Sequence, residues 1–328
     1  MIPNQWYIVL ASKEISPGKL VGVTRMGEKM VFWRDSQGKI GCLVDQCPHR
    51  GVAFSAGKLM RDCVQCPFHG FEFDTTGRCT LIPANGRSAE VPKVFKAKAY
   101  PVRELHGLVY LWWGEPRGEY PALPDFDFMN DPNLVYAATT DVWNTHYSRV
   151  IENQLDVVHV PFVHYNTIGR GNKTVVNGPR YTMEDQKEGD AILNIWVKNE
   201  VDTGQVPLKA GDIAPIERHP QLQFIFPNLW HNWISDTFHL ILAFVPIDGE
   251  NTKLYFRSYH SVKFPIARQI TNFFSNRSNI LIANQDKRVV VTQRPFRSDL
   301  RIGEKLIPGD GPVIEYRRRR QALIEGKT

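Results

Sequence analysis

The sequence predicts an α+β protein with two parts, an all-β module followed by a domain that combines a sheet with helices. Up to about residue 118, short apolar runs alternate with turn residues and no helical spacing appears. A connector with Pro121 and Pro124 follows, and the chain beyond it mixes strand-like runs with two segments of helical spacing. We therefore expect domains at residues 1–118 and 119–328.

Turn residues bound the strands expected in the first domain. Asp35-Ser36-Gln37-Gly38 separates two apolar runs, and Thr75-Thr76-Gly77 separates two more, so both turns predict hairpins. The expected strands are Trp6–Leu10, Lys29–Trp33, Lys39–Val44, Phe71–Asp74, Cys79–Ile82, Lys98–Val102 and Leu108–Trp113.

The second domain is expected to alternate strands with helices. The predicted helices are Ser148–Val160 and Pro265–Thr292, and the second begins with a proline, a residue favoured in a first helical turn. Its apolar set is Ile266, Ile270, Phe273, Phe274, Ile280 and Ile282. The predicted strands are Val135–Trp143, Ala191–Val197, Leu222–Phe226 and Phe238–Val245.

Composition narrows the class of protein. The 328 residues are 42% hydrophobic and 23% charged, which is ordinary for a globular protein, and the net charge is +6. Basic residues do not alternate with aromatic ones, so nucleic-acid binding is not indicated. The run Leu240–Val245 is too short to span a bilayer, and the N-terminus lacks a signal sequence, so we expect no membrane association and a cytoplasmic location. The run Arg317–Arg320 predicts the solvated face of a last helix, or else a patch that meets an acidic electron donor.

Two cysteine–histidine pairs lie close together in the first domain. Cys47-Pro48-His49 and Cys66-Pro67-Phe68-His69 are separated by sixteen residues, and Gly51 and Gly70 follow the pairs. Thiolates and imidazoles both suit iron, and two histidines that replace two cysteines on one iron of a [2Fe–2S] cluster make a Rieske centre. We expect Cys47 and Cys66 to bind the inner iron and His49 and His69 the outer iron.

A structural zinc site is the alternative for these four residues. Zinc ligands usually come as a pair of cysteines and a pair of histidines, like with like. Here each loop mixes the two types, and both loops place proline directly after the cysteine. The pattern favours the cluster. Three cysteines remain, an odd number without a disulfide framework, which favours reduced thiols and a reducing compartment.

A second candidate metal site lies in the segment from Asn153 to His164. On one continuous helix Asn153, Asp156 and His159 would share a face, and Pro161 disfavours helix at Val160, so that the chain could return His164 to the side of His159. Two histidines and one carboxylate form a facial triad that leaves positions on Fe(II) open.

Asp286 is the candidate for the carboxylate. It is the only acidic residue between Glu250 and Asp299, and it lies on a largely apolar stretch where an unpaired carboxylate would be costly to bury. An ion pair with Lys287 or Arg288, or simple exposure, is the alternative. His159 and His164 could likewise be ordinary core or capping histidines. The cluster motif upstream makes the iron triad the better interpretation.

These motifs resemble the oxygenase component of Rieske non-heme iron oxygenases over most of the chain. The family's D-x₂-H-x₄-H motif matches Asp156, His159 and His164, and its later carboxylate matches Asp286. The resemblance implies that Asp156 bridges His159 to His69 of the partner subunit. This in turn implies a ring, typically a homotrimer, with electron transfer between subunits. It also implies a helix-grip catalytic domain of the START/Bet v1 kind with an antiparallel sheet, and it places Asn153 near the iron.

The resemblance further implies a terminal oxygenase that takes electrons from NAD(P)H through a reductase or ferredoxin and uses O₂ to hydroxylate a small substrate. A short single chain resembles the vanillate- and dicamba-type demethylases, which points to monooxygenation and oxidative demethylation in aromatic catabolism. A ring-hydroxylating dioxygenase that forms a cis-diol is the alternative. An electron carrier of roughly a hundred residues would not need the second domain, and a redox sensor is the other non-enzyme option. Trp230, His231 and Trp233 are candidates to line an aromatic pocket.

Overall fold

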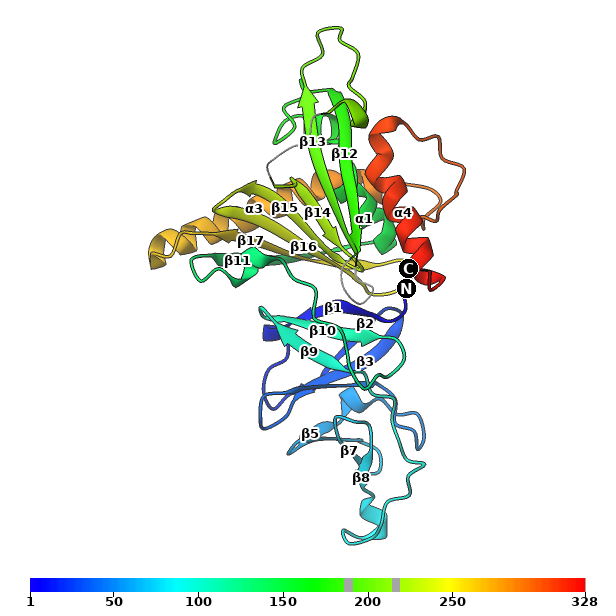
Figure 1. Ribbon diagram of the computed structural model, residues 1–328. Coiled ribbons are helices and arrows are strands. Elements are labelled where there is room, and N and C mark those ends of the chain that lie inside the picture. The colour runs from blue at the N-terminus through cyan, green and yellow to red at the C-terminus, as the bar shows by residue number, and fades with distance from the viewer. Residues whose placement is uncertain (186–190, 214–218, 328) are drawn as a thin grey trace. The chain divides into compact units, whose positions relative to one another are not determined.

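The computed structural model describes residues 1–185, 191–213 and 219–327, which form two compact units (Figure 1). One unit is Asn4–Leu123, and the other is Pro124–Thr328 together with Met1–Pro3. The first consists of strands with short 3₁₀ turns, and the second combines a large antiparallel sheet with helices. The expected α+β class is therefore confirmed.

The first unit contains three small antiparallel sheets. Their orders are β1-β10-β9, β2-β3-β4 and β5-β6-β7-β8. The two predicted hairpins are confirmed as β3 with β4 and β7 with β8. The strands are β1 Gln5–Ala11, β2 Val21–Arg25, β3 Glu28–Arg34, β4 Ile40–Val44, β5 Lys58–Met60, β6 Cys63–Gln65, β7 Glu72–Phe73, β8 Cys79–Leu81, β9 Val102–Leu105 and β10 Leu108–Trp113.

The strand predicted at Lys98–Val102 is wrong in its extent. The segment before Val102 meets β4 through two backbone hydrogen bonds, from Val44 to Lys98 and from Tyr100 to Cys42, and it forms only an isolated bridge. Pro101 has no N–H to donate, so a regular ladder does not continue through it. The paired strand β9 begins at Val102 instead.

The second unit is built on a seven-stranded antiparallel sheet in the order β11-β17-β16-β15-β14-β13-β12. Helix α3 packs against β11 and β17, and α1 packs against β16 (Figure 1). The strands are β11 Val135–Trp143, β12 Val175–Asp185, β13 Ala191–Glu200, β14 Leu222–Ile225, β15 Leu229–Ser235, β16 Phe238–Pro246 and β17 Thr252–His260. The helices are α1 Tyr147–Leu155, α2 Val160–Val163, α3 Pro265–Val290 and α4 Gly311–Ile324. None of the helices in the described residues is long and apolar enough to cross a membrane.

Helix α3 has an unusual polarity. It was predicted to carry an apolar set, yet four of those six residues face solvent, and Phe273 and Phe274 are 61% and 63% exposed. The inward positions follow helical spacing and are mostly polar: Asn272, Asn276, Asn279, Ala283 and Asp286. Asn272 bonds His260 at 2.8 Å, and Asn279 donates to Ser258 at 2.9 Å. The side of α3 that faces the sheet is therefore a polar stripe, which runs toward Asp286.

Buried arginines of α4 hold α1 in place. Arg317 and Arg320, only 4% and 3% exposed, lie on the buried face of α4, so the prediction of a solvated arginine run is wrong for these two residues. Arg317 Nε donates to Glu152 of α1 at 2.7 Å, and both Arg317 and Arg149 bond Glu304. The three-residue spacing of Arg317 and Arg320 turns them to the same side, while Arg318 points to solvent.

Two buried histidines predict a loss of stability in acid. Burial lowers the pKa of His146 to about 3, aided by Arg320 and Arg297, and burial with the neighbouring His239 lowers the pKa of His231 to about 3. Unfolded histidines titrate near pH ~6.5, so below that pH the unfolded chain binds more protons than the folded one. The contribution of these two histidines to the free energy of unfolding should therefore be full above pH ~6.5 and fall as the pH drops toward 3. Urea unfolding at pH 7.5 and 5 measures this, and His231→Gln should lose less stability between the two values. An equal loss in the variant and the wild type would contradict the assignment to His231.

Candidate metal centres

The two Cys-His loops of the first unit have nearly identical backbones. The carbonyl of Cys47 accepts from Gly51 N–H at 2.8 Å, and the carbonyl of Cys66 accepts from Gly70 N–H at 3.1 Å. Each cysteine N–H in turn donates to the residue five positions on, Val52 or Phe71, at 2.8 Å. Gly51 and Gly70 have φ of 74° and 73°, a conformation that a Cβ disfavours. The repeated motif in the sequence thus corresponds to a repeated turn.

The side chains of these loops separate by type. Cys47 and Cys66 are buried, whereas His49 and His69 are exposed, with ring centroids 4.7 Å apart. Burial raises the pKa of the Cys47 thiol to about 11, and the adjacent Cys66 adds to the rise against backbone hydrogen bonds. Two thiols side by side in a buried position, with two imidazoles at the surface, fit a [2Fe–2S] cluster whose outer iron lies toward solvent.

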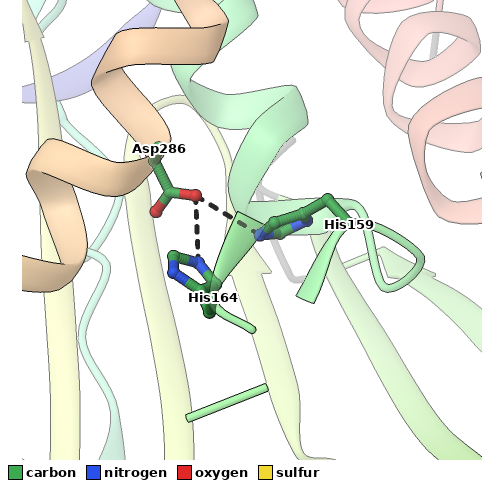
Figure 2. Close-up of side chains that lie close together, drawn as sticks. All are labelled: His159, His164 and Asp286. Atoms are coloured by element: carbon green, nitrogen blue, oxygen red, sulfur yellow. Dashed lines mark ion pairs between the residues drawn. The ribbon is translucent and has the colours of Figure 1, made fainter. Parts of the chain in front are cut away.

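The second unit brings His159, His164 and Asp286 together (Figure 2). Asp286 Oδ1 lies 3.1 Å from His164 Nε2 and 3.4 Å from His159 Nε2. One ligand atom from each of the three side chains lies within 4.8 Å of the others. Asp286 comes from α3, while the histidines flank α2, so residues more than a hundred positions apart meet at one point. The donor set of two imidazoles and a carboxylate fits Fe(II).

The local path of the chain differs from the predicted helix. Helix α1 ends at Leu155, and Asp156 is extended with φ −74° and ψ 125°. Its carboxylate accepts the N–H groups of Val158 at 2.6 Å and of His159 at 3.1 Å, as a helix cap does. Asn153, Asp156 and His159 therefore do not share one helical face. Pro161 was expected to disfavour helix at Val160, the last residue of the predicted helix, yet Val160 begins α2, because Pro161 stands in the first turn, where a missing N–H costs nothing.

The triad is electrostatically coupled. Burial acts to raise the pKa of Asp286, but hydrogen bonds and charge from His159 and His164 lower it to about 2. Burial acts to lower the pKa of His159, but Asp156 and Asp286 raise it to about 9. The carboxylate of Asp156 lies 3.6 Å from His159 Nδ1. His159 thus lies between two acids, with Nε2 toward Asp286 and Nδ1 toward Asp156.

Hydrogen bonds around the triad orient its members, and three of the residues involved, Gln154, Thr167 and Gln285, were not predicted. His164 Nδ1 lies 2.8 Å from Gln285 Oε1, which also accepts from Thr167. Since that oxygen can only accept, His164 carries a proton on Nδ1, and in the neutral ring this leaves Nε2 open for a metal. Gln154 donates to Asp286 Oδ2 at 3.5 Å, and Asn153, which was predicted, donates to Oδ1 at 3.3 Å. Neighbouring side chains on a helix point about 100° apart, so the position of Gln285 next to Asp286 did not predict that it would reach His164.

The alternatives for Asp286 do not hold in the structure. The side chain is only 3% exposed, and Lys287 bonds Asp141 at 3.2 Å instead. Arg288 Nε donates to the backbone oxygen of Gln285. Asp286 is therefore a buried carboxylate whose partners are the two histidines and the amides of α1.

A hollow opens beside Asp286, with about 340 Å³ of empty space when the part open to solvent is counted. It lies among α1, α3 and the strands β11, β16 and β17, and the predicted pocket residues Trp230, His231 and Trp233 are not among those that line it. Trp230 is part of the hydrophobic core, and His231 pairs with His239 at 3.1 Å. The residues that line the hollow are Trp143, Gln154, Leu240, Leu242, Leu254, Phe256, Asn279, Ile282, Ala283 and Asp286.

Two family models match the chain. Residues 5–101 match the Rieske [2Fe–2S] domain, and residues 143–326 match the vanillate O-demethylase oxygenase C-terminal domain. The second match covers more than half of the sequence. The chain therefore belongs to the Rieske non-heme iron oxygenases whose catalytic domain is of the vanillate O-demethylase type. The family resemblance seen in the sequence is confirmed, and the residues fit a [2Fe–2S] cluster and a mononuclear iron site.

Known proteins with similar sequences cover part of the chain. The oxygenase component of dicamba O-demethylase from Stenotrophomonas maltophilia is 32% identical over 164 residues, which are 50% of this chain and 48% of that protein. The iron-sulfur subunit of a toluene-4-sulfonate monooxygenase system from Comamonas testosteroni is 28% identical over 61% of this chain and 56% of its own length. A cholesterol 7-desaturase from Ciona intestinalis is 32% identical over 50% of this chain but only 35% of its own length. The matches thus span about a third to about half of these relatives.

Solved structures match over nearly the whole length. Dicamba monooxygenase bound to dicamba superposes with a TM-score of 0.72 at 19% identity, covering 99% of this chain and 98% of that one. NdmA of Pseudomonas putida CBB5 gives a TM-score of 0.73 at 21% identity, covering 98% and 90%. The oxygenase in a ferredoxin complex of carbazole 1,9a-dioxygenase gives 0.77 at 20% identity, also covering 98% and 90%. At these identities the likeness shows the shared fold.

Proposed function

We propose that this chain is the terminal oxygenase of a multicomponent Rieske system, and that it hydroxylates a small substrate with O₂ by monooxygenation, leading to oxidative demethylation. One observation carries the proposal: a largely buried His-His-Asp set, whose Asp286 lines a hollow, lies in a chain that also matches the Rieske domain. The catalytic domain's match to the vanillate O-demethylase family supports the demethylase type.

Each part of the chain has a proposed role. Residues 1–118 accept electrons through a cluster bound by Cys47, His49, Cys66 and His69. Residues 119–328 hold iron through His159, His164 and Asp286 and bind the substrate beside it. Bound iron would supply O₂ activation, as in other sites with two histidines and a carboxylate. The apolar walls of the hollow keep water from the reacting carbon.

Asp156 and Asn153 are proposed to act without binding the metal. Asp156 faces His159 Nδ1, so it holds that ring with Nε2 toward Asp286. Its second task would be to meet His69 of the partner subunit in a homotrimer, which gives electrons a short route into the iron site. Asn153 donates to Asp286 and orients the carboxylate.

The electron donor would be a reductase or a ferredoxin supplied by NAD(P)H. The exposed edge formed by His49 and His69 is the proposed point of entry. One related structure contains a ferredoxin complex, which supports a protein donor. Sedimentation showing that the active species is a monomer would contradict electron transfer between subunits.

Product analysis tests the reaction type. With a reductase and a methoxyarene, the chain should release formaldehyde in proportion to O₂ consumed, because a hydroxylated methoxy carbon collapses to formaldehyde and a phenol. A cis-diol without formaldehyde would favour the alternative, a ring-hydroxylating dioxygenase. Iron-replete protein that reduces its cluster but consumes no O₂ across a substrate panel would contradict the proposal and favour an electron carrier or a redox sensor.

Gln285 is expected to set the metal affinity. Replacing it with leucine removes the acceptor for His164 Nδ1–H, so the ring can rotate or change tautomer. The dissociation constant for Co²⁺ at the iron site should rise by about 10–100-fold. Calorimetry of protein with the iron removed measures this. Gln285→Glu keeps an acceptor and should bind nearly as well, whereas equal weakening in both variants would contradict this role.

A further inference from the structure

The hollow beside Asp286 is lined by apolar and neutral polar side chains. Seven of the ten lining residues are apolar, and of the other three only Asp286 carries a charge. No lysine, arginine or histidine is among them. Within the described residues that line it, the hollow therefore offers no positive side chain to an anionic ligand.

The basic residues next in the chain to lining residues are already paired or point elsewhere, and His159 and His164, which contact Asp286, belong to the proposed iron site. Lys287 follows Asp286 on α3, but its ammonium bonds both carboxylate oxygens of Asp141 at 3.2 Å. Arg257 lies on β17 next to Phe256, and successive strand residues point to opposite faces of a sheet. Phe256 lines the hollow, while the Arg257 guanidinium lies over the ring of Tyr136, 4.4 Å from its centre.

Two neutral amides remain to recognise a substrate. Asn279 uses one N–H to bond Ser258, its only hydrogen-bond partner among the described residues, and Gln154 uses its amide nitrogen on Asn153 and Asp286. An amide side chain has two donors and two acceptor lone pairs, so Asn279 retains both a donor and an acceptor. One turn earlier on the same polar stripe, buried Asn276 Oδ1 lacks a partner within the described part of the chain.

Building on the proposed function, we infer that the substrate is an uncharged, aromatic-sized molecule with one amide-like or carbonyl group, which Asn279 binds while the apolar walls hold the ring. A carboxylate or sulfonate in this hollow would lose its water without gaining a lysine or arginine partner among the lining residues. A neutral amide loses less hydration free energy on burial, and it can both donate a hydrogen bond to Asn279 and accept one from it. The neutral polar stripe on α3 is thus a specificity device that excludes anions.

A matched pair of ligands tests the inference. 4-Methoxybenzamide and 4-methoxybenzoate have nearly the same shape, but only the second is charged at neutral pH. Binding is measured by calorimetry on anaerobic, iron-loaded protein without a reductant, so no turnover is needed. The amide should bind at least ~10-fold more tightly. Equal or tighter binding of the carboxylate would overturn the inference, as would binding of neither compound.

Variants of α3 make the test independent of the absolute affinities. Asn279→Leu should weaken binding of the amide but not of methoxybenzene, and Asn279→Lys should reverse the preference in favour of the carboxylate. Asn284→Lys is the matched control, because it adds the same charge to an exposed position of the same helix and should leave the preference unchanged. An unchanged preference in Asn279→Lys would contradict the role of Asn279.

Measurements of binding and of turnover distinguish a failure of the proposed oxygenation from a failure of the inferred substrate class. If the amide binds preferentially but no O₂ is consumed once a reductase is supplied, the proposed oxygenation fails while the substrate class stands. If methoxybenzoate is preferred and is demethylated, the oxygenation stands and the inference fails.

Discussion

Replacement of Asp286 by alanine is expected to remove the mononuclear iron while the cluster keeps its colour. Asp286 contacts both histidines through one oxygen and is the only acid of the triad, so its loss leaves two imidazoles without a carboxylate ligand. Removal of a partner outside the coordination sphere commonly lowers metal affinity by about 10–100-fold. Loss of a ligand should therefore lower the iron affinity by more than ~100-fold. Iron analysis and the visible spectrum of the same sample measure both sites.

The control for this experiment is Asn284→Ala, an exposed substitution two residues away on the same helix. It should retain both metals and normal turnover. Retention of mononuclear iron and activity by Asp286→Ala would remove Asp286 from the proposed ligand set. Loss of the cluster as well would instead indicate general unfolding and not a local effect.

Asp156→Asn is expected to leave both metals bound and to lower turnover by about 100-fold. The asparagine oxygen can still accept from the N–H groups of Val158 and His159, so the turn between α1 and α2 should survive. What is lost is the negative charge that faces His159 Nδ1 and, in the proposed homotrimer, the link to the partner's cluster. The rate at which a reduced cluster is reoxidised by O₂ in the presence of substrate measures this loss.

Asp156→Ala distinguishes the effect of losing the negative charge from the effect of losing the hydrogen bonds that form the turn. Alanine removes the acceptor as well, so this variant should also lose iron affinity and stability, by about 0.5–2 kcal/mol for a missing cap. Normal cluster reoxidation in Asp156→Asn would refute the bridge. Iron loss in Asp156→Asn equal to that in Asp156→Ala would show that Asp156 acts through the fold alone.

The cluster loops were predictable because their information is local. The two mixed Cys-His pairs and the glycines after them specify a repeated turn, and the hydrogen bonds of Gly51 and Gly70 form that turn twice. The triad was assembled from residue types and family resemblance, and the structure brings the same three side chains together. The predicted backbone path between the two histidines and α1 was wrong. The Asp156 side chain accepts backbone N–H groups, and α1 therefore ends one turn earlier than the periodicity indicates.

Packing between distant parts of the chain determines three features that the sequence alone did not predict. Helical spacing shows that α3 has two faces but not which one meets the sheet, and here the asparagines turn inward while Phe273 and Phe274 face solvent. An arginine run usually indicates a solvated surface, yet Arg317 is buried because Glu152 and Glu304 come from distant parts of the chain to pair with it. Arg320 is buried where it donates to the backbone oxygen of Ser298. The hollow depends on five elements that meet only in the folded domain.

The most direct test of the central claim is the metal and acid-labile sulfide content of protein purified without oxygen, with an EPR spectrum of the reduced form. A cluster together with a mononuclear site predicts about three irons and two sulfides per chain, and a rhombic signal of the Rieske type. Zinc without sulfide would contradict the account for both centres.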